Sequence, residues 1–210
     1  MIPKGFSKNL WSDRPIDRLA YAHDASMYRL VPKAVSRPEN ESDVILILRY
    51  ANETNTPITF RAGGTSLSGQ SVSEGIIAEI IRGWQNHKII DNGRSIRLQP
   101  GVVGARANLY LSNYNRRIGP DPASINAARI GGIVSNNSSG MVCGVKYNTY
   151  HTLKNMRFIL ANGNTYDTSN KDDYGRFLNN EMALSNGLLE SKKKINNNNH
   201  LLKKIKDKYL

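Results

Sequence analysis

Residues 61–71 (the first loop) constrain this chain most, because together with Phe60 they read Phe-Arg-Ala-Gly-Gly-Thr-Ser-Leu-Ser-Gly-Gln-Ser. Three glycines allow the backbone to approach a ligand closely or to adopt positive φ, and successive N–H groups in such a turn form a concave anion site. Residues 57–60 are typical of a short buried strand, so the loop leaves the carboxyl end of a strand, where α/β sheets bind ligands. This pattern predicts a nucleotide pyrophosphate site.

Two common phosphate-binding loops do not fit these residues. From Gly64 the spacing matches the P-loop, but Gln70 and Ser71 stand where that motif needs Lys followed by Ser or Thr. The dinucleotide motif Gly-x-Gly-x-x-Gly is absent, and residues 76–81 predict another strand instead of a helix. We therefore expect a strand–loop–strand cradle, with a glycine-rich hairpin whose hydroxyls face water as the alternative.

Composition limits the remaining function classes. A chain of 210 residues can form one domain or two small lobes. No apolar run approaches the about 20 residues of a membrane span, and the N-terminus lacks the apolar core of a signal peptide, so a cytoplasmic protein is expected. Cys143 is the single cysteine, which we expect to be buried, and no metal site is predicted.

The net charge of +12 does not indicate a nucleic-acid partner. Half of it lies in residues 192–210, which hold seven Lys and one Asp. The other basic side chains are spread without clusters or interleaved aromatic residues, unlike a nucleic-acid surface.

Hydrophobic spacing predicts the order of secondary structure along the chain. Helices are expected over residues 14–22, 39–55 and 103–115. Strands are expected over residues 33–37, 57–60, 76–81, 88–91, 95–99, 153–160 and 162–166. Asn92-Gly93 and Asn162-Gly163 are hairpin turn signals. The first strand, the helix and the second strand form a βαβ unit that leads into the first loop.

Residues 127–140 (the second segment) are also rich in glycine and small side chains, reading Ala-Ala-Arg-Ile-Gly-Gly-Ile-Val-Ser-Asn-Asn-Ser-Ser-Gly. Small side chains are typical of backbone that lies flat against a ligand. A glycine-rich turn between packed helices is the alternative.

Both stretches, in this order and at this spacing, resemble the flavin domain of vanillyl-alcohol-oxidase-type (PCMH-type) FAD proteins. Within that class the chain is most similar to the FAD-linked D-lactate dehydrogenase and glycolate oxidase family, from about residue 24 to residue 167. The resemblance implies an α+β fold with two lobes, a small βαβ lobe over about 24–82 and a larger mixed-sheet lobe over about 83–185. Residues 186–210 would be a Lys- and Asn-rich helical tail or linker towards a substrate cap that is absent from this chain.

The resemblance also implies the residues that contact the flavin. Arg61 would either help to bind the pyrophosphate or form a surface ion pair. Thr65 stands where some relatives carry the His that attaches the flavin, so FAD would be bound noncovalently. The four His residues show no ligand spacing, and no catalytic residue can be assigned. The expected cofactor-binding residues are Arg61, Ala62, Gly63, Gly64, Thr65, Ser66, Leu67, Gly69, Gln70, Asp121, Pro122, Ala127, Ala128, Gly131, Gly132, Asn136, Asn137, Ser138, Gly140 and Ile159.

The implied function is that of the FAD-binding domain of an oxidoreductase that moves a hydride from a D-2-hydroxyacid, of the D-lactate or glycolate type, to flavin N5. A truncated FAD-binding module without turnover and a UDP-N-acetylmuramate dehydrogenase-like reductase are the alternatives. The hydroxyacid would be held by the missing cap, and an iron–sulfur protein or a quinone would accept the electrons. The protein would be cytoplasmic or peripheral to the inner membrane.

Overall fold

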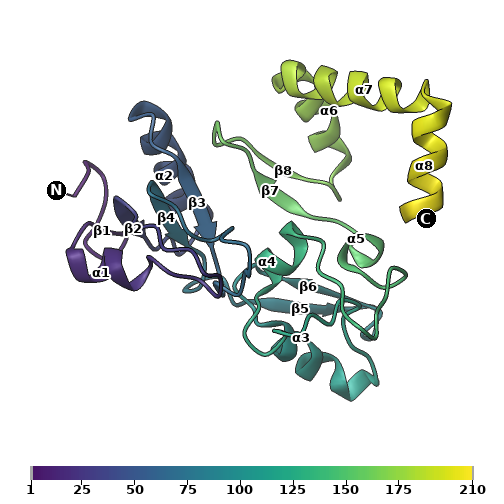
Figure 1. The fold of residues 1–210 in the computed structure, drawn as a ribbon, viewed down its shortest axis with the longest axis horizontal. Coiled ribbons are helices and arrows are strands. Elements are labelled where there is room, and N and C mark those ends of the chain that lie inside the picture. Colours follow the sequence, from purple (N-terminus) through teal and green to yellow (C-terminus); the bar gives the residue numbers. More distant parts are fainter. Residues whose placement is uncertain (1, 210) are drawn as a thin grey trace. The chain divides into compact units, whose positions relative to one another are not determined.

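The computed structural model describes residues 2–209 and divides into two compact units. The first runs to Lys154 and takes in Ile159–Asn164, and the second comprises Asn155–Phe158 and the chain from Thr165 onward. Figure 1 shows the elements of both. No helix within residues 2–209 combines the length and apolar character needed to cross a bilayer.

A four-stranded sheet forms the centre of the first unit. In spatial order its strands are β1 (Trp11–Ser12), β2 (Ala34–Ser36), β4 (Ile76–Glu79) and β3 (Ile58–Arg61). β2 and β3 both pair parallel to β4, whereas β1 is antiparallel to β2. The three strands predicted from residues 33–37, 57–60 and 76–81 are confirmed.

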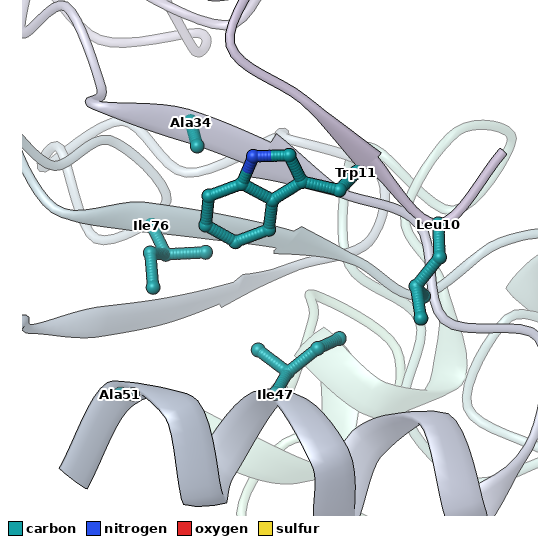
Figure 2. Packing of buried hydrophobic residues seen from close by; sticks show 6 residues of the cluster. All are labelled: Leu10, Trp11, Ala34, Ile47, Ala51 and Ile76. Atoms are coloured by element: carbon teal, nitrogen blue, oxygen red, sulfur yellow. The ribbon is translucent and has the colours of Figure 1, made fainter. Parts of the chain in front are cut away.

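Helix α2 (Glu41–Glu53) supplies the other half of the core. The side chain of Asn40 accepts a hydrogen bond from the backbone N–H of Asp43, which caps the helix at its predicted start. The inward stripe carries Ile47, which is fully buried against Ile76 of β4 and Trp11 of β1. Figure 2 shows these side chains between the helix and the strands. Burying an isoleucine of this kind stabilises the fold by roughly 1.5–3 kcal/mol.

The strand pairing excludes the alternative that the first loop is a hairpin. β2, α2 and β3 form the predicted βαβ unit, and β4 lies between the two strands of that unit. Because β3 and β4 are parallel, the glycine-rich hairpin is wrong: the chain must pass from the carboxyl end of β3 to the opposite end of β4. Residues 62–75 make that passage.

The remaining elements of the first unit precede, include and follow the second segment. β5 (His87–Ile90) and β6 (Ser95–Leu98) form the predicted antiparallel hairpin, with positive φ at Asn92 and Gly93. The helix predicted to Asn115 is shorter, because α3 (Gly104–Leu111) tightens into a 3₁₀ turn (Ser112–Tyr114) and stops where Asn115 adopts a left-handed conformation. Short helices α4 (Ile130–Ser135) and α5 (Thr149–Thr152) follow.

The second unit is mostly helical. β7 (Arg157–Ile159) and β8 (Thr165–Asp167) form the predicted two-stranded sheet. The rings of Phe158 and Tyr166 pack tilted against each other, and Phe177 of α6 (Lys171–Asn180) meets Tyr166 edge to face. Helices α7 (Met182–Asn196) and α8 (Asn199–Tyr209) complete it; α1 (Pro15–Ala20) belongs to the first unit, where it falls within the predicted helix.

Candidate functional site

Arg61 ends β3 and binds the preceding chain. Its Nη1 donates to the carbonyl oxygen of His23 at 2.6 Å and to that of Tyr21 at 3.3 Å. Its guanidinium carbon also lies 5.3 Å from the centre of the Tyr21 ring. These partners are neither the phosphate nor the ion pair expected from the sequence, so Arg61 positions the start of the first loop. A contact between Arg61 and the cofactor stays a prediction.

Unpaired backbone N–H groups are the most informative feature of the first loop. Within the part of the chain that the structure describes, the N–H groups of the five residues from Gly63 to Leu67 have no hydrogen-bond acceptor. The loop is closed behind them by Ser66, whose Oγ accepts the N–H groups of Ser68 and Gln70 at 3.2 Å and donates to Gln70 Oε1. Five successive free donors can bind an anion without a lysine.

Two glycines allow this arrangement. Gly64 has φ +62, a left-handed conformation that costs other residues free energy. At Gly63 an added Cβ would lie 2.6 Å from the carbonyl oxygen of Ala127. The first loop therefore contacts the second segment backbone to backbone, and this contact brings two of the predicted site stretches together.

The second segment is held in place mainly by backbone bonds. Ala127 and Ala128 precede α4, and Gly131 within α4 donates its N–H to the carbonyl of Pro100 at 2.9 Å. An added Cβ at Gly132 would meet no atom within 4 Å, so space is open beside it. After the helix, the buried hydroxyl of Thr149 donates to the carbonyls of Ile133 and Ser138.

Asn136, Asn137, Ser138 and Gly140 form the turn after α4. Ser138 Oγ donates to Asn136 Oδ1 at 2.6 Å, and the Asn137 side chain accepts the N–H of Tyr150. These bonds fix the turn on itself and on α5.

Asp121, with Pro122 beside it, supports the end of that turn. The backbone of Gly140 packs on Asp121, whose carboxylate accepts the N–H groups of Val142 and Cys143 at 3.1 and 3.2 Å. Partial desolvation raises the pKa of Asp121, but the hydrogen bonds from Cys143 and Val142 outweigh it and leave the pKa below its usual value. The carboxylate of Asp121 therefore binds backbone N–H groups of the protein itself.

Ile159, the last residue of β7, lies in a different place. It packs against the apolar cluster of Val44, Leu48, Ile80 and Trp84, beneath α2. Neighbouring residue Ala161 accepts a hydrogen bond from the Asn52 side chain at 2.7 Å. The structure therefore ties the predicted site residue Ile159 and the turn after it to α2, through contacts different from those of the two glycine-rich stretches.

Asp24 was missed by the site prediction. Its Oδ1 accepts the N–H and the hydroxyl of Ser26 at 2.8 and 2.5 Å, and its Oδ2 accepts the N–H and the hydroxyl of Ser71 at 3.4 and 2.9 Å. Burial raises the pKa of Asp24, but these bonds outweigh burial and lower it. The Asp-x-Ser sequence is typical of an Asx turn, yet it does not reveal the distant partner Ser71.

Beside Arg61 the Tyr21 hydroxyl donates to Glu79 Oε1 at 2.5 Å, whereas His151 and His87 contact other groups of the chain. His151 Nδ1 lies 2.8 Å from the carbonyl oxygen of Val145, and the His87 ring stacks on Tyr110 at 3.6 Å. Cys143 is buried, as predicted. Across residues 2–209 no cluster of three His, Cys, Asp or Glu side chains has the geometry of a metal site.

Known proteins are similar to this chain in both sequence and fold. A family model described as an FAD binding domain matches residues 32–169. A D-2-hydroxyglutarate dehydrogenase of Pantoea ananatis is 34% identical over 156 residues, which are 72% of this chain and 15% of that protein. Glycolate oxidase subunit GlcD of Bacillus subtilis is 30% identical over 165 residues, 77% of this chain and 35% of that protein. The chain thus spans only a minor part of these relatives.

Solved structures give the same fold. 6-Hydroxy-D-nicotine oxidase of Arthrobacter nicotinovorans aligns with a TM-score of 0.67 and 16% identity over 77% of this chain and 36% of that one. An alkyldihydroxyacetonephosphate synthase aligns with a TM-score of 0.66 and 18% identity over 81% of this chain and 35% of that one. The chain therefore belongs to the FAD-binding-domain family, with the PCMH-type fold and FAD as its cofactor.

Proposed function

We propose that this chain is the flavin-binding part of an FAD-dependent dehydrogenase of D-2-hydroxyacids, and that the first loop binds the FAD pyrophosphate. The observation that carries the proposal is the row of unpaired N–H groups from Gly63 to Leu67. The substrate class rests on the identity to a D-2-hydroxyglutarate dehydrogenase and to a glycolate oxidase subunit.

The chain's own residues bind and orient the cofactor. The first loop offers five N–H donors to the two phosphate charges, and the open space beside Gly132 gives the cofactor room. Because the first loop has Thr65 and neither His nor Cys, FAD is held noncovalently. The remaining predicted residues of both stretches complete the site. Bound FAD supplies the hydride acceptor.

In this proposal, these residues do not form the site that holds the hydroxyacid and its catalytic base. Hydride transfer needs the donor carbon held at roughly 3–3.5 Å from its acceptor with a base in reach. The His151 ring nitrogen is beside a backbone carbonyl and the His87 ring is stacked, so neither is placed as that base. We therefore expect that the 210 residues alone do not oxidise a hydroxyacid.

Two measurements on the purified chain test this assignment. Acid precipitation of the FAD-loaded protein should release all flavin into the supernatant, whereas flavin retained in the pellet would contradict noncovalent binding. Mixing with D-2-hydroxyglutarate, D-lactate or glycolate should leave the oxidised flavin absorbance unchanged while dithionite bleaches it. Bleaching by a hydroxyacid at an enzymatic rate would place the donor site within this chain.

The substrate class is tested on the protein that the surrounding coding sequence encodes. That protein should reduce an artificial acceptor with D-2-hydroxyacids and not with their L-enantiomers. Activity confined to other donors would overturn the substrate class and leave the flavin assignment intact. The electron acceptor in this proposal is an iron–sulfur protein or a quinone, and the protein is cytoplasmic or peripheral to the inner membrane.

A further inference from the structure

A small hairpin precedes β2 and packs on the first loop. Residues 23–29 (the clamp hairpin) are closed by a bridge between His23 and Arg29, and Leu30 donates its N–H to the carbonyl of Ala22 at 3.0 Å. The hairpin precedes residues 32–169, over which the family model matches.

Three hydrogen-bonded links join the clamp hairpin to the first loop. Arg61 holds the carbonyl of His23 at the beginning of the loop. In the middle, the N–H of Ala25 donates to the carbonyl of Gly64 at 3.0 Å. At the end, the Asp24 carboxylate accepts both the N–H and the hydroxyl of Ser71. Links at three successive points fix the course of the loop.

The middle link determines which way a backbone donor points. In a trans peptide the C=O and the following N–H project in opposite directions. Since the carbonyl of Gly64 points to Ala25, the N–H of Thr65 points away from the clamp hairpin, and it has no acceptor in the described chain. The clamp therefore presents Thr65 N–H outward as a free donor.

We propose that Asp24 is a positioning residue of the cofactor site, which anchors the clamp hairpin to Ser71 and thereby holds the Gly64–Thr65 peptide with its N–H available to the FAD pyrophosphate. This inference rests on the proposed binding of the pyrophosphate at the first loop. Asp24 itself does not contact the cofactor in this account, because both its carboxylate oxygens are occupied by Ser26 and Ser71.

A carboxylate suits this position for a chemical reason. An ionised Asp accepts at both oxygens, so it can satisfy four donors from two segments, and charge-assisted bonds are stronger than neutral ones. An Asn retains one accepting oxygen and presents an NH₂ to the other pair of donors. Asp24→Asn should therefore keep part of the clamp, and Asp24→Ala should lose all of it.

The chain supplies a matched control. Asp167 Oδ1 accepts the N–H and the hydroxyl of Ser169 at 2.9 and 2.5 Å, which repeats the Asp24–Ser26 turn in the second unit. Asp167→Ala therefore removes a similar turn in the other unit. A general loss of stability would affect both variants, whereas an effect on the cofactor should be confined to Asp24.

The test measures the FAD dissociation constant by flavin fluorescence and the phosphorus NMR shifts of bound FAD at saturation. Asp24→Ala should raise the dissociation constant at least about tenfold, the loss expected for one charge-assisted hydrogen bond. Its bound phosphorus signals should move towards those of free FAD, a change that lower stability alone does not produce. Asp24→Asn should fall between Asp24→Ala and the wild type, and Asp167→Ala should match the wild type.

Two outcomes separate this inference from the site on which it rests. If Gly64→Asp, a change within the loop, leaves FAD binding intact, the placement of the pyrophosphate is wrong and the inference falls with it. If Gly64→Asp weakens binding but Asp24→Ala behaves like Asp167→Ala, the inference alone is wrong. If Asp24→Ala does not fold, the comparison of Ser71→Ala with Ser169→Ala takes its place. Equal FAD dissociation constants and equal phosphorus shifts in these two variants would overturn the proposal.

Discussion

Gly63 is the residue at which the two glycine-rich stretches meet. Because the carbonyl of Ala127 would lie 2.6 Å from an added Cβ, even one methyl group must push the backbones apart. The clash is with backbone, so it cannot be relieved by rotating a side chain.

We predict that Gly63→Ala lowers the free energy of unfolding by about 1–3 kcal/mol, as overpacking does, and weakens FAD binding at least about tenfold. Chemical denaturation and flavin fluorescence titration measure both. Gly175→Ala is the control, since its Cβ would meet no atom within 4 Å. Equal FAD affinity in the two variants would show that the contact with Ala127 does not shape the site.

Asp17 of α1 bonds to Ser12 of β1 and to Arg37, the residue after β2. Hydrogen bonds from the Ser12 hydroxyl and from Arg14, with a further one from Arg37, lower the pKa of Asp17 from 3.8 to about 2. Because the folded pKa lies below the unfolded one, the carboxylate stabilises the fold above about pH 4, and this contribution is lost as the pH falls from 3.8 towards 2.

We therefore expect Asp17→Asn to lower the melting temperature at pH 7 and to have little effect near pH 2. Thermal unfolding followed by circular dichroism at both pH values measures this. The same decrease at both would mean that Asp17 acts by its shape and not by its charge.

At this scale the sequence predicted residue types better than partners. The abundance of small side chains in both glycine-rich stretches is visible in the sequence, and the burial of Cys143 was predicted from its residue type. The bonds from Arg61 to the carbonyls of residues 21 and 23, and from Asp24 to Ser71, were not, because they join segments 38 to 47 residues apart. Only the tertiary fold decides such pairings.

The elements were predicted well where local chemistry determines them. Asn40 caps α2 at its expected start, and the Asn-Gly turn joins β5 to β6. The parallel pairing of β3 with β4 could not be predicted from the local sequence, because short apolar strands have similar sequences in parallel and antiparallel sheets. α3 ended before Asn115 because a 3₁₀ turn satisfied its last carbonyls.

The packing of α2 on the sheet gives a prediction at this scale. Ile47 is fully buried between the helix and β4, so Ile47→Ala should lower the free energy of unfolding by about 2–5 kcal/mol. Leu109→Ala is the control, because Leu109 is 68% exposed on α3 and should change it by less than about 0.5 kcal/mol. Urea denaturation compares them, and equal effects would contradict the assigned core.

Over the whole molecule, the residues that match the FAD-binding family and the two compact units have different boundaries. The family model spans residues 32–169, while the unit boundary falls in the β7–β8 hairpin, before the match ends. The lobe boundary near residue 82 and the tail from residue 186 were inferred from the resemblance and stay predictions. Composition alone carries no signal for a division that runs through a hairpin.

The central claim is that the first loop binds the FAD pyrophosphate, and Gly64→Asp tests it most directly. Asp tolerates the left-handed φ of +62 better than most residues, and its Cβ would meet only the flexible end of the Arg61 side chain, at 2.7 Å, so the fold should survive. Its carboxylate adds a negative charge among the free N–H groups. The measurement is the FAD dissociation constant of Gly64→Asp against that of Gly175→Asp, each with its circular dichroism spectrum. The account predicts at least about a hundredfold weaker binding for Gly64→Asp alone, with both spectra like the wild type. Equal FAD affinities in the two folded variants would contradict it.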